Sequence, residues 1–83
     1  MKCIFQPSAD KKFAKLPPEI KKRIITKLDF FTSTSNPLLF AEPLSRHEIG
    51  QYRFRIGDYR IIFDLKDKDI IILNLGHRRD IYR

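Results

Sequence analysis

The segment "YRFRIGDYR", residues 52–60, places three arginines and three aromatic residues in nine positions around a Gly-Asp pair. Guanidinium groups that face one another across a sheet repel by about 0.2–1 kcal/mol per pair, so such a cluster suits the binding of an anion such as phosphate. The alternative is a solvated basic surface whose arginines pair with Asp58, Asp64 or Glu48. The segment therefore predicts an anion site, with an ordinary charged surface as the competing interpretation.

The last eight residues, "GHRRDIYR", add Arg78, Arg79, Arg83 and the aromatic Tyr82. Binding of an unstacked nucleotide needs cations for the phosphates and a ring for the base, and this segment carries both. The alternative is that Tyr82 covers the edge of the core while the arginines form a soluble tail.

Composition and charge restrict the class of protein. The chain of 83 residues is expected to form a single domain, 1–83, and its 17 Lys and Arg against 10 Asp and Glu give a formal net charge of +7. Hydrophobic residues make up 42%, which indicates a folded protein. The positive excess favours a polyanionic partner, with nucleic acid first, an acidic protein segment second and an anionic membrane third.

Motifs for metal or cofactor chemistry are missing from the sequence. Cys3 is the only cysteine, and no metal-ligand spacing, glycine-rich phosphate loop or Ser/His/Asp order is present, so neither a metal nor a cofactor is expected. The apolar stretch near the N-terminus is too short for a signal-peptide core. These features predict a cytoplasmic protein without a membrane span.

The N-terminal part of the chain is expected to form a strand and a short helix. Residues 1–6 partly alternate and are followed by Pro7, which predicts one strand. Ser8 is the expected N-cap of a helix over residues 8–16.

A second, longer helix is expected after the Pro-Pro pair at residues 17–18. Its apolar stripe is Ile20, Ile24, Leu28 and Phe31, at steps of four, four and three. Residues 32–48 show no sustained period, so they are expected to form a loop with Leu44 among its apolar anchors.

After Gly50 the apolar period changes to two. The stretches "QYRFRI", "YRIIFDL" and "DIIILNLG" are separated by the short turns "GD" and "KDK", which predicts three consecutive antiparallel strands. The fold class is then α+β with the order β-α-α-β-β-β, in which two helices pack on one face of a mainly antiparallel four-stranded sheet.

The turn fixes the register of the first hairpin. With Gly57 and Asp58 as a two-residue turn, Arg55 lies opposite Arg60. This register puts Arg53, Arg55 and Arg60 on one face of the sheet. The residues on the other face, against the helices, are Tyr52, Phe54, Ile56, Tyr59, Ile61 and Phe63.

The order of elements, with "GQYRFRIGDYRIIF" in the middle and "GHRRDIYR" at the end, resembles the RelE/ParE toxin superfamily of prokaryotic toxin–antitoxin systems. The resemblance covers essentially the whole chain. The chain is more similar to the RelE branch, whose members cleave mRNA in the ribosomal decoding site, than to the ParE branch, which inhibits DNA gyrase. This resemblance implies a toxin of a type II toxin–antitoxin system. The implied activity is that of a metal-independent endoribonuclease, an mRNA interferase that inhibits translation.

The resemblance also implies roles for particular residues. In the implied reaction the ribose 2′-OH attacks the adjacent phosphate and leaves a 2′,3′-cyclic phosphate and a 5′-OH. By motif, the catalytic residues are Arg60 and Arg78, which would stabilise charge on the phosphate, and Tyr82, which would stack on or orient the target nucleotide. The further RNA-binding candidates are Arg53, Arg55, His77, Arg79 and Arg83.

The general base is not identified by these motifs. Arg53 and Arg55 stand where well-known members of the family carry lysines, and an arginine holds its proton too firmly to act as a base. Tyr82 is the remaining candidate, with His77 behind it.

The implied partners are a cognate antitoxin, which would mask the basic groove, and mRNA in the ribosomal A site, with contacts to 16S rRNA. Two other functions stay open. One is a non-enzymatic ParE-like inhibitor of DNA gyrase, for which Arg60, Arg78 and Tyr82 would not be needed together. The other is a DNA-binding module that uses the basic helix face of residues 21–27, which lacks Asn and Gln.

Overall fold

A five-stranded sheet organises the chain, and the computed structural model describes residues 1–82 of it. The strands are β1 (Cys3–Phe5), β2 (Ala41–Pro43), β3 (Tyr52–Ile56), β4 (Tyr59–Lys66) and β5 (Asp69–His77). Their order across the sheet is β1-β5-β4-β3-β2, with β1 parallel to β5 and every other pair antiparallel. The predicted mainly antiparallel α+β class is confirmed, with one strand more than expected.

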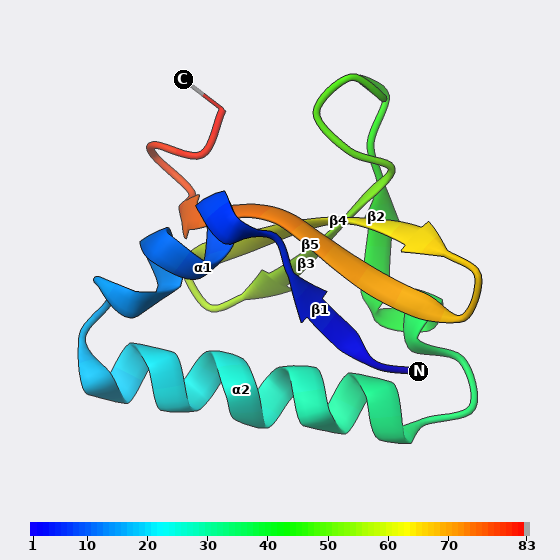
Figure 1. Ribbon diagram of the computed structural model, residues 1–83, viewed down its shortest axis with the longest axis horizontal. Helices are drawn as coiled ribbons and strands as arrows, with labels where there is room; N and C mark the ends of the chain where they lie inside the picture. The colour runs from blue at the N-terminus through cyan, green and yellow to red at the C-terminus, as the bar shows by residue number, and fades with distance from the viewer. Residues whose placement is uncertain (83) are drawn as a thin grey trace.

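Two helices, α1 (Pro7–Ala14) and α2 (Pro18–Ser33), pack against this sheet, and α2 runs along one side of it (Figure 1). The N-cap of α1 is Gln6, not Ser8 as predicted, and the Gln6 carbonyl accepts the first helical hydrogen bond from the Asp10 N–H. Pro7 explains the difference, because its fixed φ suits the first helical position and its missing N–H is not needed there.

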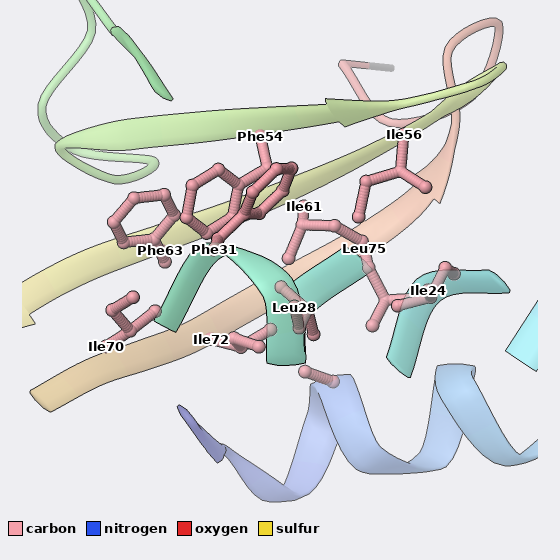
Figure 2. Close-up of a cluster of buried hydrophobic side chains, with 11 residues drawn as sticks. Ile24, Leu28, Phe31, Phe54, Ile56, Ile61, Phe63, Ile70, Ile72 and Leu75 are labelled. Carbon is pink, nitrogen blue, oxygen red and sulfur yellow. The ribbon is translucent and has the colours of Figure 1, made fainter. Parts of the chain in front are cut away.

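The core lies between α2 and the sheet, as the predicted apolar stripe requires. Figure 2 shows Phe31 of α2 against the rings of Phe54 and Phe63, with centroid separations of 4.6 Å for Phe31–Phe54 and 4.4 Å for Phe54–Phe63. Ile24 and Leu28 of α2 complete the buried stripe. Burial of each such side chain contributes about 1.5–3 kcal/mol, so this stack is a main source of stability.

The β3–β4 hairpin has the predicted register, with Arg55 opposite Arg60. Gly57 has a φ of +60°, the left-handed conformation that a type II′ turn needs at its first central position. A Cβ at this position would also come within 2.9 Å of Nη1 of Arg23 on α2. Arg53, Arg55 and Arg60 therefore share one face of the sheet, as predicted.

The prediction of a loop over residues 32–48 is wrong in part. A 3-10 helix, η1 (Pro37–Phe40), follows Asn36, whose side-chain oxygen accepts the N–H of Leu38. Strand β2 comes next and pairs with β3, so that Glu42 lies opposite Arg53. A three-residue strand is too short to show an alternating pattern, which is why the sequence did not reveal it.

The opposite face of the sheet carries a second, smaller apolar cluster. Leu44, Ile62 and Ile81 are buried there, with Ile49 and Leu73 packed against them. Loop 44–50 and the C-terminal segment both rise on this side of the sheet, away from α2 (Figure 1). Gly50 lets the loop sit this close, because a Cβ there would overlap the side chain of Ile62. The second cluster thus holds the loop and the C-terminal segment over the arginine-bearing face.

Candidate functional site

Arg53 is the centre of a hydrogen-bonded cluster on the arginine-bearing face. Its Nη1 donates to the hydroxyl oxygen of Tyr82 at 2.7 Å, and its Nη2 donates to Oε2 of Glu42 at 3.1 Å. The guanidinium carbon also lies 5.8 Å from the centroid of the Tyr82 ring. The hydrogen bond to Tyr82, together with the one to Glu42, raises the pKa of Arg53 above its usual value. Arg53 is therefore a fixed cation in this cluster.

Glu42 is the carboxylate of the cluster, and the sequence reasoning missed it. It also lies 3.6 Å from Nε of Arg55, so one carboxylate contacts two guanidinium groups. The hydrogen bond from Arg53 lowers the pKa of Glu42 below its usual range, with smaller effects of the nearby arginine charges. Only the pairing of β2 with β3 brings Glu42 here, and β2 itself was not predicted.

The carboxylates that the sequence offered as partners of the hairpin arginines are engaged elsewhere. Glu48 pairs with Arg46, Asp64 accepts the backbone N–H of Gln51, and Asp58 lies beside Arg78. Among residues 1–82, Glu42 is therefore the only carboxylate that forms a salt bridge with a hairpin arginine.

Arg60 faces the same side as Arg55, but its side chain is buried, with only 7% exposed. Its Nη1 donates to the carbonyl oxygens of Gly57 and Tyr59, both at 3.0 Å. The guanidinium therefore ties down the β3–β4 turn. The position of Arg60 on the same face as Arg55 is as predicted, but its burial at the turn is not foreseen by the strand pattern.

Arg78 meets the same turn from the C-terminal segment. Its backbone N–H donates to the carbonyl of Asp58 at 2.7 Å, and its Nε lies 3.8 Å from Oδ1 of the same residue. The side chain is about half exposed. Arg60 and Arg78 are thus both held at the turn, at the end of the row of cations that begins at Arg53.

Of the other predicted RNA-binding residues, His77 lies on the helix-facing side of the sheet, opposite to Arg53, because it pairs with Tyr59. His77 packs edge-on against Tyr59 at 5.6 Å between ring centroids, and its Nδ1 accepts the backbone N–H of Arg79. It lines a hollow of about 240 Å³ with Lys12 of α1 and Lys15, the C-cap residue of that helix, and Arg53 is not among the lining residues of this hollow. Arg79 is exposed, and Arg83 lies outside the described residues.

Next to Tyr82 the surface is hollowed. A cavity of about 240 Å³ is lined in part by Arg53 and Tyr82, and Nε of Arg53 is shielded from solvent without a hydrogen-bond partner among residues 1–82. An unpaired buried donor is uncommon in native proteins and calls for an explanation, of which a role at a functional site is one.

The described part of the chain contains neither a candidate metal-binding group nor a candidate membrane-spanning helix. Within residues 1–82, no group of three or more His, Cys, Asp and Glu side chains could hold a metal ion. No helix among these residues is long and apolar enough to cross a membrane.

A family model described as the ParE toxin of the type II toxin–antitoxin system parDE matches residues 3–82. The chain belongs to the RelE/ParE toxin superfamily. It is a toxin of the type II toxin–antitoxin class, which confirms the family expected from the "GQYRFRIGDYRIIF" and "GHRRDIYR" motifs.

Individual relatives support the RelE/ParE assignment. The chain is 33% identical over 81 residues to Toxin RelG of Mycobacterium tuberculosis strain H37Rv, a match that covers 95% of this chain and 92% of that protein. The toxin–antitoxin complex RelBE2 of the same organism contains a chain that superposes with a TM-score of 0.74 at 29% identity, over 93% of this chain and 96% of that one. A RelB–RelE complex of Methanococcus jannaschii gives a TM-score of 0.73 at 26% identity, over 95% and 94%.

Proposed function

We propose that this toxin is a ribosome-dependent endoribonuclease that cleaves mRNA by attack of a ribose 2′-OH on the adjacent phosphate. The observation that carries the proposal is the cluster around Arg53, in which a carboxylate, two guanidinium groups and a phenol meet on one open face. A surface that only bound a protein would not need these groups in mutual contact.

Charge stabilisation falls to the arginines. The phosphate passes through a state with additional negative charge, which fixed donors stabilise best when they are held in place before the reaction. Arg55 and Arg78 have exposed guanidinium groups that a phosphate can reach. Arg60 is buried at the turn opposite Arg55 and adds a fixed positive charge at this end of the site.

Proton transfer falls to Glu42 and Tyr82. Glu42 has a lowered pKa and is ionised at neutral pH, so it can take the proton of the attacking 2′-OH. The Tyr82 oxygen accepts a hydrogen bond from Arg53, and we propose that its hydroxyl group donates a proton to the leaving 5′ oxygen. In this scheme Tyr82 acts as the acid, and it replaces the sequence-based hypothesis of a Tyr82 or His77 base.

The proposed partners follow from the relatives and from charge. Two solved relatives are toxin–antitoxin complexes, so we propose a cognate antitoxin that covers the Arg53 cluster. The formal charge of +7 supports binding to mRNA in the ribosomal A site and to 16S rRNA there. Action on translating ribosomes would place the toxin in the cytoplasm.

A second candidate function is inhibition of DNA gyrase. One observation favours it, because the matching family model is described by the ParE toxin. This function requires no proton transfer, so it makes different predictions for Glu42 and Tyr82.

Cleavage of a ribosome-bound message tests the proposal. Arg78→Ala should lower the cleavage rate by about 10²-fold, as loss of one preorganised donor does, while Lys27→Ala, an exposed cation on α2, should leave it unchanged. Tyr82→Phe separates two roles: a large loss supports proton transfer, and a small one supports stacking alone. Growth arrest that survives both Arg78→Ala and Tyr82→Phe, without new mRNA ends, would instead favour gyrase inhibition.

A further inference from the structure

Loop 44–49 lines a hollow together with Tyr82, and the proposed mechanism gives this loop no role. Two hollows, of about 240 Å³ and 400 Å³, share Arg46, Ile49 and Tyr82 among their lining residues. We call the space between loop 44–49 and Tyr82 the Tyr82 cleft. Figure 1 shows the loop and the C-terminal segment rising on the same side of the sheet. The residues that line the two hollows come from both segments.

Both walls of the cleft are anchored to the same small core. Leu44 and Ile49 at the two ends of the loop pack with Ile81, the neighbour of Tyr82, in the second apolar cluster. The hydrogen bond from Arg53 fixes the hydroxyl end of the Tyr82 ring. The cleft is therefore built in advance rather than assembled by a loose tail.

The polar groups in the cleft are mainly hydrogen-bond donors. Nε of Arg46 donates to Glu48 at 2.9 Å, which orients the guanidinium, and within residues 1–82 its two terminal nitrogens have no partner. Oδ1 of Asn74 already accepts from Nζ of Lys12 and from the N–H of Leu75. The amide nitrogen of Asn74 is therefore the group left to bind a ligand, and it too is a donor.

An aromatic wall, an apolar floor and a set of donors match one class of ligand. An unstacked nucleobase stacks on an aromatic ring or a guanidinium plane and is read along its edge. Guanine presents two acceptors, O6 and N7, on the edge that arginine binds with two hydrogen bonds, whereas adenine places an amino donor there. Adenine keeps the N7 acceptor, but its N6 amino group would face a second donor of the cleft and lose one of the two hydrogen bonds.

We propose that the Tyr82 cleft binds one unstacked base of the RNA substrate and selects guanine over adenine through Arg46. The inference rests on the proposed ribonuclease function for its biological setting, but binding in the cleft can be measured without cleavage. Glu48 acts as a positioning residue, because its contact is with Arg46 and not with the base.

Binding of nucleotides to the whole chain tests the cleft directly. Guanosine and adenosine monophosphates are titrated separately at low salt, and binding is followed by the NMR signals of the Tyr82 ring. We expect the guanosine nucleotide to bind about tenfold more tightly, within the range for one bidentate arginine contact. The Arg46 side chain is 68% exposed, so its replacement should leave the fold intact.

Three variants separate base recognition from simple attraction of phosphate. Arg46→Ala should remove the preference for guanosine, and Arg46→Lys should remove it as well while keeping the charge, because an ammonium lacks the paired donors. Arg79→Ala, an exposed cation at which no base contact is proposed, should lower both affinities equally and leave the preference intact.

The outcomes decide the proposal in either direction. Equal affinities of the wild-type protein for the two nucleotides, or a preference that survives Arg46→Lys, would overturn it. On ribosomes, Arg46→Ala should lower the ratio of cleavage at guanine-containing to adenine-containing A-site codons by about tenfold while cleavage itself continues. Absence of cleavage at every codon would contradict the proposed function, whereas the nucleotide titration would still report on the cleft.

Discussion

Replacement of Arg60 by Ala should destabilise the fold, although the same arginine is also a catalytic candidate. Its guanidinium makes two hydrogen bonds to the turn carbonyls of Gly57 and Tyr59, each at 3.0 Å. A hydrogen bond from a charged group contributes about 1.5–3 kcal/mol. Both bonds come from a single nitrogen, and in the variant water can bind the two turn carbonyls in its place. We therefore expect the two bonds together to contribute about 2–3 kcal/mol to the free energy of unfolding.

One effect acts in the opposite direction. Removal of Arg60 also removes its repulsion with Arg55, which raises the free energy of unfolding by about 0.2–1 kcal/mol. The net loss is then about 1–3 kcal/mol. At about 4–8 °C per kcal/mol for a domain of this size, the melting temperature should fall by roughly 5–20 °C.

Thermal unfolding followed by circular dichroism measures this loss. Arg78→Ala is the matched control, because its side chain is about half exposed and its contact with Asp58 is long, at 3.8 Å. The control should melt within a few degrees of the wild type. An Arg60→Ala protein that melts together with the control would refute the structural role of this arginine. A loss of activity in Arg60→Ala must therefore be compared with its stability before it is assigned to catalysis.

Three other changes test the core, the thiol and the proposed base. Phe63→Ala removes a fully buried ring and should cost about 3–5 kcal/mol, measured by urea unfolding, whereas Leu39→Ala, at 78% exposure, should cost little. Burial raises the pKa of Cys3 to about 11, so at pH 8 iodoacetamide should modify the thiol of the native protein about 100-fold more slowly than the thiol of the unfolded chain. The free energy of unfolding should fall as pH rises from 9 to 11, because the unfolded chain loses this proton first. Glu42→Gln should tighten RNA binding, because it removes a negative charge, and yet abolish cleavage. The cleavage rate of the wild type should stay level from pH 8 down to pH 5, because the pKa of Glu42 is lowered. A fall in rate between pH 7 and pH 6 would point to a histidine base.

The hairpin that carries the arginines could be predicted from sequence because its signals are local. Gly57 supplies the turn, and alternation on both sides of it sets the register, so the side of the sheet on which Arg53 and Arg55 lie follows directly. The N-cap of the first helix was misplaced by two residues, at Ser8 instead of Gln6, because Ser8 and Pro7 are both helix-starting signals and the fixed φ of proline decided between them.

The arrangement of the site depends on contacts between distant segments, which sequence reasoning could not supply. Glu42 reaches Arg53 only because β2 pairs with β3, and that pairing rests on three residues that include a proline. Arg60 pairs with Gly76 of β5 and is buried, and its guanidinium donates to the carbonyls of Gly57 and Tyr59, contacts that strand alternation does not predict. Alternation predicts the face of a side chain but not what covers it.

Mapping of mRNA 5′ ends after brief induction of the toxin tests the central claim most directly. Message with and without translating ribosomes is compared for the wild type and for Tyr82→Phe, whose ring should still fit the site. We expect new 5′-hydroxyl ends within translated codons, dependent on ribosomes and strongly reduced in Tyr82→Phe. Growth arrest by the wild type with no new ends, accompanied by loss of DNA supercoiling activity, would contradict it.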